Sequence, residues 1–130
     1  MSVSNNFLRL GVLSALVGMS LGVWMGASEN FTLSPVHAHI NLLGFASMML
    51  FGLFYRIIPA AAQGWLATVH FILAVLGFLI LAPCLAWLLL GHREIVPVLA
   101  AGEIMLVASM LLFTVIVFRA TGRTGEPATA

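Results

Sequence analysis

The chain carries very little charge. Charged residues make up 7% of its 130 positions, and the basic side chains are all arginine, with no lysine. A soluble domain carries about 25% charged residues, so this chain has too few of them to cover a surface in water. The net charge of +1 gives no basic surface for nucleic acid. The composition therefore indicates an integral membrane protein that has no nucleic-acid partner.

Cysteine is almost absent as well, since Cys84 is the single one in the sequence. A lone cysteine excludes a disulfide within the chain and any Cys-x-x-Cys metal or redox motif. Cys84 lies in the middle of an apolar run, where an isolated cysteine usually behaves as a small hydrophobic residue. We therefore expect the chemistry of this protein to come from other side chains.

Hydrophobic residues, in contrast, make up 62% of the chain and gather in four long runs. Apolar runs of 18 or more residues are typical of membrane-spanning helices. We expect spans at 7–27, 34–58, 65–90 and 95–118, with Ser34 capping the second span and Pro35 in its first turn. The predicted fold is all-α, with four transmembrane helices in one domain, 1–120, and a disordered cytoplasmic tail, 121–130. A cleaved signal peptide is the alternative for the first run, but the length of that run argues against it.

The arginines predict the orientation of the four spans. With four spans, one side of the membrane receives all but one of the arginines, namely Arg9, Arg56, Arg119 and Arg123. Only Arg93 falls on the other side. Because arginine is enriched on the cytoplasmic side, both termini are expected to be cytoplasmic. The start of the second span and the turn around residue 92 then lie at the outer side.

Small residues recur every four positions in the first span, at Ser14, Gly18, Gly22 and Gly26. Such a face lets another helix backbone approach closely. The neighbouring helix can belong to the same chain or to another subunit, and the sequence leaves both possibilities open.

Few polar side chains interrupt the spans: His37, His39, Asn41, Tyr55, Arg56, His70 and Glu103. A polar group inside a bilayer is costly, so each is a functional candidate. Histidine dominates the set, and neutral imidazole is a ligand for haem iron, copper or zinc. His70 is expected to be a packed polar residue near the inner interface. It cannot share a metal with His37 of the same chain, because a helix of the length of the second span covers about 30 Å. Glu103 is expected to be neutral or hydrogen-bonded, and the roles of both residues stay open.

His37 and His39 are one residue apart at the start of the second span. Successive helical residues are rotated by about 100°, so these two imidazoles point about 200° apart. They are not expected to bind one ion together within a chain, and each should face a different neighbour. Asn41, one turn after His37, is expected to orient it. His92 and Arg93, in the outer turn, are either solvated or placed to pair with haem propionates.

The stretch PVHAHINLLGF at 35–45, continued by GLFYR at 52–56 and by Pro59, resembles a known family. This family consists of short bacterial membrane proteins described as haem–copper oxidase subunit I-like, or cytochrome c oxidase-like. The resemblance implies a fold like one four-helix arc of subunit I, in a bacterial inner membrane. It also implies haem or copper ligands in the outer half of the second helix. One chain lacks the full histidine set of an oxygen-reducing site.

Helix geometry and the resemblance together predict a protein that binds haem b through two histidines, for electron transfer or redox sensing. His37 of one subunit would face His39 of the next in a homotrimer, with Asn41 behind the ligand and His92 or Arg93 on the propionates. A respiratory-chain electron donor is the expected partner, and an electron-transfer role is favoured over a complete oxidase. The alternatives are an accessory or assembly subunit of a respiratory oxidase without its own cofactor, and a copper-binding membrane protein.

Overall fold

The computed structural model of the chain describes residues 2–122. Within them the long helical segments are α1 (Val3–Ser28), a second span built from α2 (Ser34–His39), η1 (Ile40–Ser47) and α3 (Met48–Ile57), then α4 (Trp65–Leu89) and α5 (Val96–Gly122). All four segments are long and apolar enough to cross a membrane. The predicted all-α fold with four candidate spans is therefore confirmed, and the chain is a multi-pass membrane protein by length and composition.

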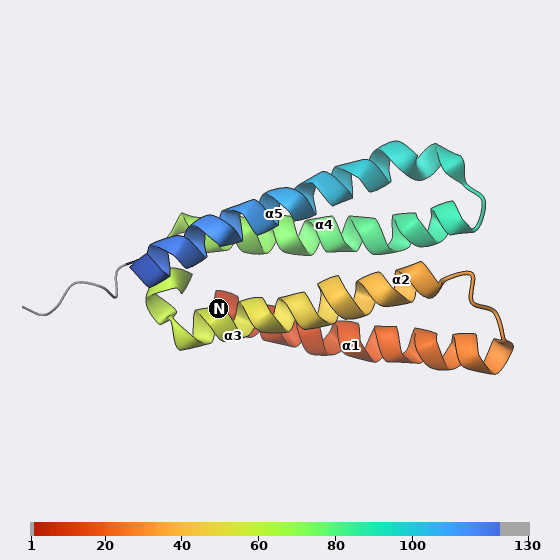
Figure 1. Cartoon of the computed structure of the whole chain (residues 1–130), viewed down its shortest axis with the longest axis horizontal. Coiled ribbons are helices and arrows are strands. Elements are labelled where there is room, and N and C mark those ends of the chain that lie inside the picture. The colour runs from red at the N-terminus through yellow and green to blue at the C-terminus, as the bar shows by residue number, and fades with distance from the viewer. Residues whose placement is uncertain (1, 123–130) are drawn as a thin grey trace, which may run out of the picture.

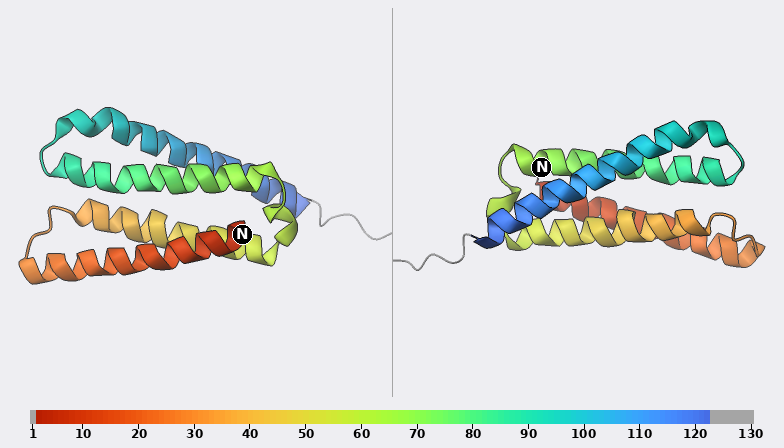
Figure 2. Two further views of the ribbon diagram at one scale, coloured as in Figure 1. Left: turned by 180° about the vertical axis from the view of Figure 1, so that it is seen from behind. Right: turned by 45° about the horizontal axis from the view of Figure 1, so that its top comes forward.

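The helices form two hairpins that lie side by side (Figures 1 and 2). The first pairs α1 with the second span, and the second pairs α4 with α5. The start of α1 and the end of α5 lie at the same end of the bundle, together with the short turn η2 (Pro59–Ala62). We call this the inner end. The turns at 29–33 and 90–95 lie at the opposite, outer end, as the predicted topology requires.

Helix ends differ from the expected ones where polar side chains hold them. α1 begins four residues before the predicted start at residue 7. The Ser4 hydroxyl donates to the Gly52 carbonyl at 2.9 Å, and Arg56 donates to the Asn5 side-chain oxygen at 2.6 Å. These bonds tie the first turn of α1 to α3, so the helix extends through polar residues.

Two smaller expectations about helix ends were wrong. Ser34 is the first residue of α2 rather than its cap, because Leu33 takes the cap position without a side-chain hydrogen bond. α5 continues through Arg119 to Gly122, so residues 121 and 122 are helical and not part of a tail. The rest of the predicted tail, 123–130, lies outside the described residues.

The small-residue face of α1 packs inside the chain. A side chain at Gly18 would collide with Asn41, one at Gly22 would collide with His37, and Ser14 lies against Gly44. At Gly26 an added carbon would meet nothing within 4 Å. Three of the four positions therefore serve the contact between α1 and the second span, which answers the question that the sequence left open.

The middle of the second span is a π-helix, Ile40–Ser47, that begins directly after His39. The Ser47 hydroxyl donates to the Leu42 carbonyl five residues earlier, at 2.9 Å. No sequence pattern predicted this segment. π-Helical turns inside α-helices are rare and occur frequently at functional sites. The π-helical segment therefore makes the outer half of the second span a candidate functional region.

Cysteine labelling is expected to verify the topology. In a Cys84→Ala background, we expect single cysteines at Asn30 and Ala60 to react with a membrane-impermeant thiol reagent from opposite sides. Both positions are exposed, and they lie at opposite ends of the bundle. In intact cells only Asn30→Cys should react, because the arginine-rich end is expected inside. Reaction of both from one side would contradict the four-span arrangement, and reaction of Ala60→Cys alone would reverse the orientation.

Candidate functional site at the outer end

His37 lies in the contact between the second span and α1. Its Nδ1 is 2.9 Å from the Gly18 carbonyl oxygen of α1. A carbonyl oxygen only accepts hydrogen bonds, so Nδ1 must carry the proton and donate it. In this tautomer the lone pair of the ring is on Nε2. No hydrogen bond to that Nε2 is found among residues 2–122, and the side chain is only half-buried.

Two glycines of α1 provide the space for this arrangement. A Cβ at Gly22 would lie 2.8 Å from Cε1 of His37, closer than real carbon atoms approach. A Cβ at Gly18 would lie 2.6 Å from the amide nitrogen of Asn41. His37 and Asn41, one helical turn apart, therefore fit into a notch that any side chain at these positions would close.

Asn41 contacts His37, as expected. Its amide Nδ2 donates to the His37 carbonyl at 2.9 Å and lies 3.4 Å from Nδ1 of the ring. Nδ1 of His37 already donates its proton to the Gly18 carbonyl, so Nδ1 and the Asn41 Nδ2 are both donors. The 3.4 Å contact between them is therefore packing and not a hydrogen bond. Asn41 thus fixes the backbone and one edge of the imidazole rather than accepting its proton.

His39 has the same tautomer in a different environment. Its Nδ1 donates to the Pro35 carbonyl, one turn earlier in its own helix, at 2.7 Å. The side chain is half-buried, like that of His37. Within the described part of the chain its Nε2 also forms no hydrogen bond. The two histidines therefore face different surroundings, and each leaves one ring nitrogen with an available lone pair.

His92 already has partners in the outer turn. Its ring stacks on Trp87 with 4.0 Å between the ring centroids, and its Nδ1 is 3.2 Å from the Glu94 carboxylate. The Trp87 Nε1–H also donates to Glu94, at 3.4 Å. A haem propionate would have to compete with this carboxylate. Arg93 is exposed and forms no ion pair among the described residues, so it is the better placed of the two for that role.

Sequence reasoning missed a buried pair at the inner half, between Tyr55 and His70. The Tyr55 hydroxyl is 2.9 Å from Nδ1 of His70, and the two side chains are 1% and 0% exposed. They come from consecutive spans on either side of one short turn, and antiparallel pairing places them at equal depth. The available signal was two isolated polar residues flanking that turn, Tyr55 two residues before the end of α3 and His70 five residues after the start of α4.

Aromatic rings surround His70. Phe7, Phe51 and Phe113 lie with their centroids 5.2, 4.6 and 5.0 Å from that of the imidazole. Its Nε2 is buried without a hydrogen-bond partner in residues 2–122. If Tyr55 donates to Nδ1, then Nε2 carries a proton that can interact weakly with the ring faces. The reverse orientation would turn a lone pair toward those faces. The contacts favour the first arrangement, and His70 is a packed polar residue, as expected.

Glu103 is exposed on α5, in the outer half of the bundle. No hydrogen bond to its carboxyl group is found among residues 2–122. Of the two states expected from the sequence, neutral or hydrogen-bonded, these residues therefore do not provide the second.

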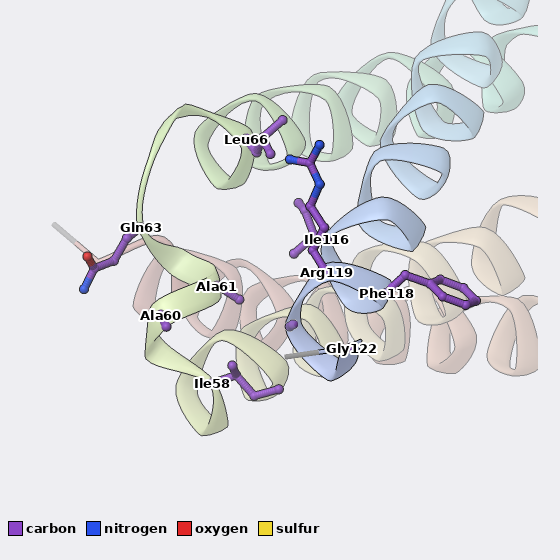
Figure 3. Close-up of a pocket in the computed structure, with 10 residues that line it drawn as sticks. Ile58, Ala60, Ala61, Gln63, Leu66, Ile116, Phe118, Arg119 and Gly122 are labelled. Atoms are coloured by element: carbon purple, nitrogen blue, oxygen red, sulfur yellow. The ribbon is translucent and has the colours of Figure 1, made fainter. Parts of the chain in front are cut away.

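A hollow of about 630 Å³ lies at the inner end, between η2 and the last turns of α5 (Figure 3). Arg119 reaches across it toward Leu66, whereas Gln63 points away from it. Because this hollow is at the end opposite His37 and His39, it is not part of the histidine site.

A single chain does not assemble a complete metal site. Among residues 2–122, no group of three or more His, Cys, Asp or Glu side chains lies close enough to hold a metal ion. Comparisons with protein-family models, with curated proteins and with solved structures gave no significant match. The resemblance to the oxidase-like family therefore stays a prediction, and the functional argument rests on the geometry of the histidines.

Proposed function

We propose that this protein binds haem b between subunits, with His37 and His39 as axial ligands, and serves electron transfer or redox sensing. The observation that carries the proposal is the shared tautomer of the two histidines. In each, Nδ1–H donates to a backbone carbonyl and Nε2 keeps its lone pair. Metal-bound histidines almost always have this second hydrogen bond, which fixes the ring and raises its basicity.

The directions of the two rings favour a site shared between chains. A haem iron needs its axial ligands on opposite faces, and two residues two positions apart on one helix cannot supply both. They lie at nearly the same depth, since each residue adds about 1.5 Å along the helix. One repeated contact that turns each chain by about 120° brings His37 of one subunit opposite His39 of the next and closes at three.

Each neighbouring residue has a defined part in this proposal. The Gly18 carbonyl and Asn41 hold the His37 ring, and the Pro35 carbonyl holds His39. Arg93, exposed and without an ion pair among residues 2–122, is the first candidate for the propionates, and His92 is the second. Bound haem supplies one-electron chemistry. With two histidine ligands no iron position is left open, which favours electron transfer over oxygen chemistry.

The direct test is the absorption spectrum and composition of the purified protein. We expect a Soret band with sharp reduced α and β bands, one haem per chain, and a trimer by mass. A colourless protein with bound copper would support the copper-binding alternative. A colourless protein with neither would support an accessory or assembly subunit of a respiratory oxidase in a bacterial inner membrane.

The notch on α1 gives a second prediction. Gly22→Ala should lower haem affinity about tenfold or more, because the added methyl group displaces the His37 ring and overpacking costs about 1–3 kcal/mol. Gly26→Ala is the matched control, since a methyl group there meets nothing within 4 Å. Haem titration of both variants, followed in the Soret band, measures the difference. Equal affinities would show that the notch does not position the ligand.

A further inference from the structure

A crevice of about 340 Å³ lies between α1 and α4, the two helices that are nearer the viewer in the left panel of Figure 2. Leu13 and Val17 of α1 line one wall, Leu79 of α4 lines the other, and Ile40 and Met48 of the second span lie at its base. Its volume is in the range of small-molecule sites, about 300–1,000 Å³, and too small for a protein helix. The walls are almost entirely apolar.

Ser14 supplies the one polar side chain in the lining of this crevice. Its side chain is 9% exposed and held against Gly44 of the second span. Serine and threonine in membrane helices commonly bond to the carbonyl four residues earlier. Four others in this chain do so, namely Ser20, Ser28, Thr114 and Thr121. Ser14 does not, and within residues 2–122 its hydroxyl has no hydrogen-bond partner.

The depth of Ser14 restricts what can satisfy it. At about 1.5 Å per residue, Ser14 is about 16 Å from the inner end of α1 and about 21 Å from its outer end. A phospholipid presents only methylene groups at this depth, because its ester carbonyls lie near the interface. A molecule that reaches Ser14 with an acceptor oxygen must itself be dissolved in the hydrocarbon.

We propose that this crevice binds a lipophilic carbonyl compound of the isoprenoid quinone class, with one ring carbonyl accepting a hydrogen bond from Ser14. The ring and the first part of its tail lie along the apolar walls. A quinone in the bilayer has no donor for its carbonyl, so a single hydrogen bond in the crevice is a net gain. The site does not depend on haem, and its failure would leave the haem proposal untouched.

The experiment uses the full chain in lipid nanodiscs, with decylubiquinone carrying ¹³C-labelled carbonyls as the probe. We expect saturable binding, measured by equilibrium gel filtration, and a shift of one carbonyl stretching band to lower wavenumber. Ser14→Ala should weaken binding about threefold to tenfold and abolish the shift, as expected for one hydrogen bond inside a membrane protein. Ser20→Ala is the matched control, because Ser20 is on the same helix and bonds to its own backbone.

A second pair of variants tests the volume of the crevice. Leu13→Trp should fill it and abolish binding, whereas Leu16→Trp should have no effect, since Leu16 is not in the lining. The two leucines are 57% and 59% exposed, so both variants should fold, which circular dichroism checks. Saturable binding that is weakened in Ser14→Ala, lost in Leu13→Trp and unchanged in Ser20→Ala and Leu16→Trp supports the site. Absence of saturable binding, or equal affinity in Ser14→Ala, would overturn it and leave water or a neighbouring subunit as the occupant.

Discussion

Replacing either His37 or His39 by alanine is expected to remove all bis-histidine haem from the protein. In the shared arrangement every haem takes one ligand of each kind, so each substitution removes one axial ligand from all the sites of a trimer. Haem content and the reduced α band, measured on purified trimers, give the result. His70→Ala, in protein that folds, is the control, because His70 is paired with Tyr55 in the inner half and is not proposed to contact haem. Full haem content in either ligand variant would contradict the proposal.

Mixing the two inactive chains makes this test sharper. A trimer that contains both His37→Ala and His39→Ala chains has one junction where an intact His37 faces an intact His39. Co-expression should therefore restore about a third of the wild-type haem per mixed trimer, although neither variant binds haem alone. Ligands that both come from one chain would give no such recovery, and a monomer that keeps its haem would exclude the shared site.

The buried Tyr55–His70 pair should show strong energetic coupling. Tyr55→Phe leaves Nδ1 of His70 without its partner, and His70→Leu leaves the Tyr55 hydroxyl unpaired among aromatic rings. Each single substitution is expected to lower the free energy of unfolding by about 1–3 kcal/mol. The double variant removes both polar groups and should cost less than the sum of the two. Unfolding of the four proteins in detergent micelles provides the double-mutant cycle. Additive losses would show that the two groups do not interact.

Two further variants, His70→Ala and Glu103→Gln, separate stability from haem binding. Tyr55 and His70 lie in the inner half of the bundle, far from His37 and His39 along the second span. His70→Ala should therefore leave any haem spectrum unchanged in protein that folds. Glu103→Gln should do so as well, because Glu103 is on α5 and its exposed carboxyl group forms no hydrogen bond among residues 2–122. Loss of haem from folded His70→Ala would place the iron ligand on α4 instead of the second span.

The sequence predicted the spans well because long apolar runs have few alternatives in a membrane. The separate directions of His37 and His39, and the contact between His37 and Asn41, follow from helical spacing within one segment. The acceptors of the two Nδ1 protons could not be predicted in the same way. Gly18 becomes the partner of His37 only through the packing of α1, and small residues at regular spacing do not identify the helix that they meet.

The missed features have the same origin. Tyr55 pairs with His70 through the contact between two spans, and each residue alone reads as an interfacial or packed polar group. α1 extends to Val3 because of bonds from Ser4 and Asn5 to α3, although its first residues are polar. The apolar pattern describes each helix separately, so it could not predict which side chains contact each other between helices.

The π-helical segment Ile40–Ser47 sets how the outer half of the second span is rotated about the helix axis relative to the inner half. Its wider turn changes the phase of the outer six residues relative to Met48–Ile57, compared with a continuous α-helix of the same length. If the same residues formed a regular α-helix, with no π-turn to take up one of them, the outer histidines would be rotated by about 100°. His37 would then leave the notch on α1, while Tyr55 would stay beside His70. A change between π and α winding in this segment is thus a route by which evolution can redirect His37 and His39 while the contacts of Met48–Ile57 stay unchanged.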